Sequence, residues 1–188
     1  FEELYTKYEK EIPDLKKIKA RALMSKIIEA QIETGQPYML YKDSINNKSN
    51  QKNIGVIKSS NLCAEIVEYS EKDETAVCNL ASIALPKFVT DEGKYDYQDL
   101  YQVAKLATKN LDQVIDINFY PTDKTENSNS RHRPIGLGIQ GLADVYFKMN
   151  IPYDSVQAQI INKQIFETIY FGALEASMEL AADKGAYS

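Results

Sequence analysis

The sequence predicts an α/β protein in which long amphipathic helices alternate with short apolar strands. Apolar residues recur at steps of three or four along several long stretches, a spacing typical of helices that bury one face. Short β-like runs lie between these stretches. The composition, 44% apolar and 26% charged over 188 residues, is that of an ordinary folded domain. The strand content is too small to close a barrel by itself.

Two helices are predicted at the start of the chain. One face of the first would hold Phe1, Leu4, Tyr5 and Tyr8. Pro13-Asp14 then supplies a break and an N-cap. The second helix is expected over residues 15–34, and Gly35 and Pro37 provide its stop.

The middle of the chain contains the expected strands and their connections. The strand candidates are residues 38–41, 54–58 and 62–69. Polar connections are expected at residues 42–53, a loop rich in Asn and Ser, and at residues 71–74.

The rest of the chain is predicted to be mainly helical. Residues 76–85 form an apolar run, strand or helix, that Pro86 ends. Asp96 with Asp99 resembles a capping box and opens a long helix. The remaining expected elements are a polar loop over residues 122–133, a short helix over 141–149, and a last helix that starts at Asp154 with Gln157 and closes at Lys184-Gly185.

Charge and composition exclude several classes of protein. The net charge is −5 and no long basic run is present, so nucleic-acid binding through phosphate neutralisation is not expected. The sequence contains no run of about 18 apolar residues, so no membrane-spanning helix is expected. The charged start of the sequence does not resemble a signal peptide, so a reducing, cytoplasmic compartment is expected. Two cysteines and one histidine do not match a zinc site or a disulfide scaffold, and no metal or cofactor is expected to bind this chain.

One short segment combines three reactive side chains. Asn61, Cys63 and Glu65 follow a period of two, so in a strand they would point to one side. A lone cysteine in an apolar strand is most often a small buried hydrophobe. An amide, a thiol and a carboxylate together are a poor choice for a core, however, because each polar group would need a partner. The pattern therefore indicates a reactive site.

The sequence around these residues resembles a known family. The run SNLCAEIVEYSEKDETAVCNLASIALPKFV is similar to the active-site loop of the class I ribonucleotide reductase large subunit, in its eukaryote-like form. The upstream run TGQPYMLYKDSINNKSNQKNIGVIKSSNLC fits the same family, as do the downstream runs RHRPIGLGIQGLAD and NKQIFETIYFGALEAS. The resemblance keeps order and spacing over nearly the whole chain.

The resemblance implies a role for each candidate residue. Cys63 would become a transient thiyl radical that removes the ribose 3′ hydrogen, and sulfur suits this step because S–H and activated C–H bonds are similar in strength. Glu65 would act as general base on the 3′-hydroxyl, and Asn61 would hold the ribose hydroxyls. Cys78 would be one half of the dithiol that reduces the 2′ position, with its partner cysteine upstream of this chain. Without the resemblance, a buried packing cysteine is the alternative for Cys78.

The resemblance also implies a larger assembly. The chain would form part of a single catalytic barrel domain over residues 1–188, a partial ten-stranded α/β barrel with residues 61–65 on a central finger loop. The N-terminal ATP-binding region and the C-terminal half of the barrel would lie outside it. The function implied is reduction of ribonucleoside diphosphates to 2′-deoxyribonucleoside diphosphates. The chain alone is expected to be inactive and poorly stable, because its strand edges would be exposed.

The partners implied lie outside this chain. A small subunit with a metal-tyrosyl centre would supply the radical, and thioredoxin or glutaredoxin would supply electrons. ATP and deoxynucleotide effectors would bind elsewhere on a full-length subunit that forms a homodimer. Neither nucleic acid nor a membrane is an expected partner.

Other interpretations of the same residues remain open. The run from Gly136 to Gly141 formally matches GxGxxG, but a polar loop and Pro134 precede it, so we interpret these glycines as structural rather than dinucleotide-binding. His132 is expected to be a loop residue with a local hydrogen bond, and Arg131 and Arg133, on either side of it, to be solvated or salt-bridged. A cysteine hydrolase using Cys63 and His132 is one rival function. A non-catalytic relative that only binds nucleotide or the small subunit is another. The reductase interpretation expects Asn61, Cys63 and Glu65 to point the same way in a sealed pocket.

Overall fold

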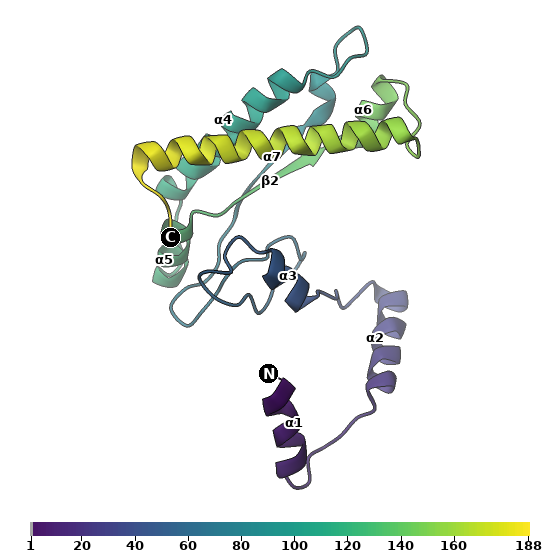
Figure 1. The fold of residues 1–188 in the computed structure, drawn as a ribbon, viewed down its shortest axis with the longest axis vertical. Coiled ribbons are helices and arrows are strands. Elements are labelled where there is room, and N and C mark those ends of the chain that lie inside the picture. Colours follow the sequence, from purple (N-terminus) through teal and green to yellow (C-terminus); the bar gives the residue numbers. More distant parts are fainter. Residues whose placement is uncertain (1) are drawn as a thin grey trace. The chain divides into compact units, whose positions relative to one another are not determined.

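The computed structural model describes residues 2–188, so the predicted place of Phe1 on the first helical face lies outside the described residues. The chain divides into two compact units, one ending at Tyr41 and the other spanning Lys42–Ser188. Both are drawn in Figure 1, coloured along the sequence.

The first unit contains two helices, α1 (Glu2–Glu11) and α2 (Ala20–Thr34). The predicted start of the second helix at residue 15 is wrong, because Asp14 has a positive φ of 59° and the N-cap is Lys19. The predicted stop is confirmed: Gly35 adopts the left-handed conformation and its N–H donates to the Gln31 carbonyl at 2.9 Å. Residues 38–41 form no strand, so that prediction is wrong, since no segment of the described chain pairs with them.

The second unit begins with α3 (Lys42–Lys48), where the sequence predicted a loop. Asn46 on this helix stabilises it against the following segment: its Oδ1 accepts from Ile57 N at 2.8 Å, and its Nδ2 donates to Ile57 O at 3.0 Å. Similarly, Gln51 Oε1 accepts from Tyr69 N at 2.8 Å. The side chains of Asn46 and Gln51 thus hydrogen-bond to backbone N–H and C=O groups that, in a strand, would pair with a neighbouring strand. The strands predicted at residues 54–58 and 62–69 are accordingly wrong, and both segments are irregular.

A parallel pair of strands forms the centre of the second unit. β1 (Asn79–Ala84) pairs with β2 (Ile135–Gln140) in a register that runs from Asn79 opposite Ile135 to Ala84 opposite Gln140. Within the run at residues 76–85, residues 79–84 are strand rather than helix, and Leu85 already belongs to the 3₁₀ helix η1 (Leu85–Phe88), which also contains Pro86. The connection between the strands is helical, as parallel strands require.

After η1, that connection contains α4 (Tyr97–Ile117) and α5 (Asp123–His132). The predicted N-cap of α4 is confirmed, since Asp96 Oδ1 accepts from Asp99 N at 2.9 Å. The loop predicted at residues 122–133 is wrong. A capping box between Thr122 and Thr125 starts α5, whose buried residues are polar, so apolar periodicity could not indicate a helix there.

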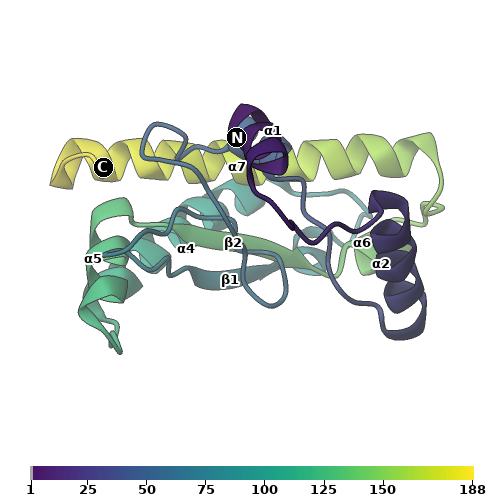
Figure 2. The same ribbon diagram turned by 90° about the horizontal axis from the view of Figure 1, so that it is seen from below.

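Two more helices complete the unit, α6 (Leu142–Lys148) and α7 (Val156–Lys184). Both were predicted, although the N-cap of α7 is Ser155 rather than Asp154. α7 packs along α4, and α4 also contacts both strands (Figure 2). A Cβ on Gly172 would lie 3.0 Å from the Tyr101 carbonyl oxygen, so glycine permits this close crossing of the helices. The fold is α/β, as predicted, and the described residues contribute two strands to it.

Candidate active site

Residues 61–66 form a tight turn, not the predicted strand. The Asn61 carbonyl accepts from Ala64 N at 3.2 Å, and Asn61 Oδ1 accepts from Ile66 N at 3.0 Å. Ser60 Oγ donates to the Ile66 carbonyl at 2.6 Å, and Ala64 has a positive φ of 68°. The period-of-two argument for this segment is therefore wrong, because the Asn61 side chain closes a turn on its own backbone.

All three predicted residues of this turn region, Asn61, Cys63 and Glu65, are exposed. The expectation of a sealed pocket is not met by the described residues alone. Cys63 lies in the turn itself and is not among the residues that line a groove beside it, which Glu65 helps to form.

That groove, of about 660 Å³, runs beside the paired strands of the second unit. It brings together groups that are distant in sequence, including Glu65, Glu68, Cys78, His132, Gly136 and Tyr187. Two of the predicted site residues, Glu65 and Cys78, thus face one space, whereas Asn61 and Cys63 are not among its lining residues.

Cys78 lies half-buried just before β1, with its Sγ 3.9 Å from the Asn79 carbonyl oxygen. Burial raises the pKa of the Cys78 thiol to about 12, and the nearby carboxylates of Glu68 and Glu65 contribute. Cys78 is therefore a neutral thiol near pH 7. A Cβ on Gly136 would lie 3.2 Å from this sulfur, so the glycine leaves room for the thiol against β2.

Glu68 is the residue of this groove that the sequence interpretation missed. Burial raises the pKa of its carboxyl, an effect that the Cys78 thiol and His132 partly offset. Its Oε2 is buried and has no hydrogen-bond partner among the described residues. An acidic residue inside the otherwise apolar run IVEY was the available signal, because placing a carboxylate among apolar neighbours is costly.

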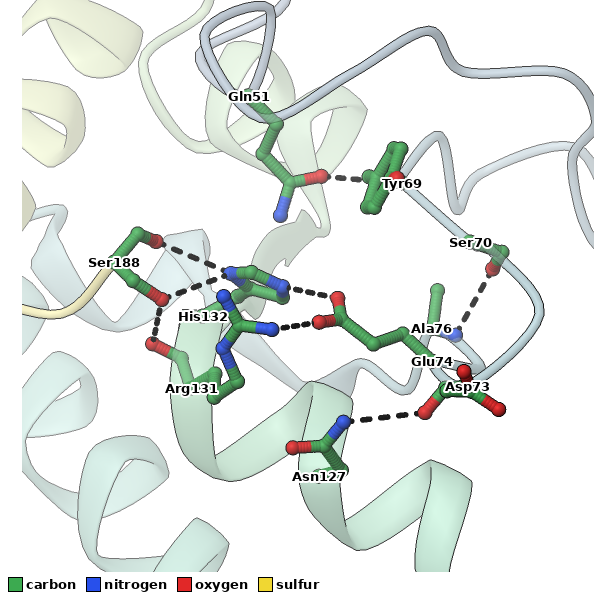
Figure 3. Close-up of polar contacts among 10 residues, drawn as sticks. All are labelled: Gln51, Tyr69, Ser70, Asp73, Glu74, Ala76, Asn127, Arg131, His132 and Ser188. Carbon is green, nitrogen blue, oxygen red and sulfur yellow. Dashed lines mark hydrogen bonds and ion pairs between the residues drawn. The ribbon is translucent and has the colours of Figure 1, made fainter.

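His132 is buried at the end of α5, with 4% of its surface exposed. Figure 3 shows its ring between Glu74 and Ser188. Nε2 lies 2.6 Å from Glu74 Oε2, and Nδ1 lies 3.1 Å from the Ser188 carbonyl oxygen. The prediction of a loop histidine with a local hydrogen bond is wrong, since both partners are distant in sequence. Because both ring nitrogens are engaged and Cys63 is not in the groove, the structure offers no support for a Cys63–His132 hydrolase pair.

The two arginines beside His132 form ion pairs, one of the two roles expected. Arg131 pairs with Glu74. Arg133 Nε donates to Asp112 at 2.6 Å and its Nη1 donates to Asp116 at 2.8 Å. Burial alone would raise the pKa of Asp112, but hydrogen bonds from Arg133 and Lys184 outweigh it and lower that pKa.

The glycine-rich run is structural, as interpreted. Gly136 through Gln140 lies within β2, not in a turn that opens a phosphate-binding helix. Gly141 has a positive φ of 81°, and a Cβ there would lie 2.7 Å from the Pro86 ring. Within residues 2–188, no group of three or more potential ligands could hold a metal ion. No helix in that range is long and apolar enough to cross a membrane.

Comparisons with known proteins agree across the whole chain. Residues 1–188 match the family model of the ribonucleotide reductase barrel domain. The chain is 59% identical over 187 residues to the ribonucleoside-diphosphate reductase large subunit of Danio rerio, covering 100% of this chain and 24% of that protein. It is 58% identical over 193 residues to the ribonucleoside-diphosphate reductase large chain 2 of Saccharomyces cerevisiae, covering 100% of this chain and 22% of that protein.

A solved structure shares the fold. The Actinobacillus ureae class Id ribonucleotide reductase alpha subunit superposes with a TM-score of 0.79 at 32% identity, covering 89% of this chain and 32% of that one. The chain spans about a quarter of the length of the curated relatives it matches.

Proposed function

Because this chain belongs to the ribonucleotide reductase barrel-domain family, we propose that it carries the active-site segment of a ribonucleoside-diphosphate reductase large subunit. The reaction replaces the 2′-hydroxyl of a ribonucleoside diphosphate by hydrogen, while two thiols become a disulfide and water leaves. The observation that supports this assignment best is the groove in which Glu65 and Cys78 meet, next to the turn that bears Cys63.

The proposal gives each side chain one task. Cys63, as a thiyl radical, takes the 3′ hydrogen of the ribose. Glu65 accepts the proton of the 3′-hydroxyl, and Asn61 both closes the turn and positions the sugar. Cys78 and a second cysteine from outside this chain supply the two electrons.

The exposure of Asn61, Cys63 and Glu65 fits a chain that works inside a larger subunit. We propose that further strands complete a ten-stranded barrel around the 61–66 turn and exclude water from the radical. A separate small subunit carries the metal-tyrosyl centre that generates the radical. Thioredoxin or glutaredoxin restores the dithiol, and the full-length subunit works as a cytoplasmic homodimer regulated by ATP and deoxynucleotides.

The substitution Glu65→Gln in the full-length subunit tests this assignment. Loss of a general base lowers kcat by about 10²–10⁴-fold, with little change in KM because the amide keeps most of the binding contacts. The kcat of the variant is measured as the rate of deoxynucleotide formation in the presence of the small subunit and a dithiol.

The matched control is Glu71→Gln, which removes an exposed carboxylate paired with Lys58 in the same segment and should leave kcat within about twofold. Normal turnover by Glu65→Gln, or no reductase activity in the unmodified protein, would instead favour the non-catalytic relative.

A further inference from the structure

Glu68 has the features of a residue that takes part in the chemistry rather than of one that only stabilises the fold. It lines the groove with Cys78, yet its Oε2 is buried and has no partner among the described residues. A buried carboxyl oxygen without a hydrogen bond is costly, so such a group calls for an explanation. The carboxylate of Glu65, by contrast, is exposed.

The charged groups around Glu68 offset only part of the effect that burial has on its pKa. His132 and Arg133 face the groove from the end of α5, but His132 is bonded to Glu74 and Arg133 to Asp112 and Asp116. The other titratable groups that line the groove with Glu68 are Glu65, Cys78 and Tyr187. Burial among these groups favours the neutral acid form of Glu68 and raises its pKa.

We propose that Glu68 is the proton donor to the Cys78 sulfur when a disulfide at that sulfur is reopened by an external dithiol. The proposal rests on the function proposed above, which oxidises Cys78 once in each turnover. It gives a role to a carboxyl group for which the ribose chemistry itself has no use.

Reopening of the disulfide transfers one electron pair and one proton to the Cys78 sulfur. A thiolate of the external dithiol attacks the other sulfur of the disulfide, the S–S bond breaks, and its electron pair leaves on Cys78 Sγ. The O–H bond of Glu68 breaks as its proton moves to that sulfur, and the carboxylate regains a proton from water in the groove. In a second exchange the remaining external thiol attacks the mixed disulfide, its S–H proton passes to the departing cysteine sulfur, and the external disulfide leaves two thiols at the site.

The direction of proton transfer follows from the two acidities. The pKa of Cys78 is raised to about 12, so its thiolate is a strong base in this groove. The pKa of Glu68 is raised from 4.5, so its acid form persists to higher pH than that of an ordinary carboxyl. Donation from Glu68 to the Cys78 thiolate is therefore downhill.

Reopening of the disulfide can be measured in the full-length subunit. The reduced enzyme is oxidised by one turnover, treated with dithiothreitol, quenched in acid, alkylated and mapped for free Cys78. In Glu68→Gln, which keeps the size of the side chain but cannot donate an acidic proton, we expect reopening to slow by about 10²-fold. Glu68→Asp should recover part of the rate, and Glu71→Gln should match the unmodified enzyme.

The pH profile separates proton donation from a structural role. The rate of disulfide reopening is divided by the concentration of dithiothreitol thiolate, which removes the titration of the reagent itself. This normalised rate should fall as pH rises through the raised pKa of Glu68, because the acid form of Glu68 is lost. In Glu68→Gln the normalised profile should be flat. A rate and profile in Glu68→Gln equal to the unmodified enzyme would overturn the proposal. So would an equal loss of rate at every pH in Glu68→Gln and Glu68→Asp.

A Cys78→Ser variant distinguishes failure of this inference from failure of the proposed function. If Cys78→Ser still completes repeated turnovers, Cys78 is not part of the reductant and both proposals fail. If Cys78→Ser no longer completes repeated turnovers, while the disulfide of Glu68→Gln reopens at the normal rate, only the role of Glu68 is overturned.

Discussion

At the scale of single residues, one buried carboxylate joins distant parts of the second unit. Glu74 is 8% exposed and bonds both Arg131 and His132 from α5. Asn127 Nδ2 also donates to the Asp73 carbonyl at 3.1 Å (Figure 3). These contacts hold the 71–74 turn, confirmed here as a turn closed by a bridge between Glu71 and Glu74, against the end of α5.

Replacing Glu74 by Ala should therefore destabilise the protein. The change leaves the buried His132 ring without its Nε2 partner, and an unsatisfied buried group costs about 1–3 kcal/mol. Thermal unfolding of the full-length subunit measures the loss. The control is Glu92→Ala, since the Glu92–Lys94 pair is exposed and worth less than about 1 kcal/mol. Equal losses in the two variants would contradict the structural role of Glu74.

The identities of the four site residues remain a prediction, whereas the backbone geometry assumed for three of them was wrong. The resemblance pointed to Asn61, Cys63, Glu65 and Cys78, and two of these four line one groove. The strand geometry assumed for the first three was wrong, because a period of two in the sequence cannot show that an asparagine will bond its own backbone. Glu68 escaped notice because its one sequence signal, an acidic residue in an apolar run, does not show that one carboxyl oxygen lacks a partner.

At the scale of elements, helix α5 depends on its caps more than on apolar packing. Its buried residues are Ser128, Asn129 and His132, and Thr122 forms a capping box at its start. Few apolar contacts thus support the helix, and its termini must supply stability.

Thr122→Ala should accordingly cost about 1 kcal/mol, the usual value for a lost N-cap. Thr168→Ala is a matched control, because Thr168 lies inside α7 and donates only to the Gln164 carbonyl of its own helix. The control should be neutral or slightly stabilising, since alanine is the better helix former. Chemical denaturation gives the free energy of unfolding of both variants. A Thr122→Ala variant as stable as Thr168→Ala would refute the importance of the cap.

Helices that pack an apolar face in the core were predicted correctly, and two polar helices of the second unit were not. Helices α4, α6 and α7 have apolar faces that pack in the core, and their sequences predicted them. Helices α3 and α5 are polar and were taken for loops. The segments at residues 54–58 and 62–69 are apolar enough for strands, but whether a strand forms depends on a pairing partner elsewhere in the chain.

At the scale of the whole molecule, large apolar surfaces remain uncovered. α7 buries one face against α4, while Phe166, Tyr170 and Phe171 are each more than 40% exposed. Within the described residues, β1 and β2 pair only with each other, which leaves their outer edges open. The α/β class was predictable from helix and strand patterns. Barrel closure remains a prediction, because the strands that would complete it are not among these residues.

Thiol mapping after one turnover tests the central claim, that this groove is a reductase active site. The reduced full-length subunit is given a ribonucleoside diphosphate and the small subunit without any external reductant, then quenched in acid, alkylated and mapped by mass spectrometry. One disulfide should form for each deoxynucleotide, joining Cys78 to a cysteine outside this chain, while Cys63 stays a free thiol. Product formation with Cys78 still free, or a disulfide that contains Cys63, would contradict the account.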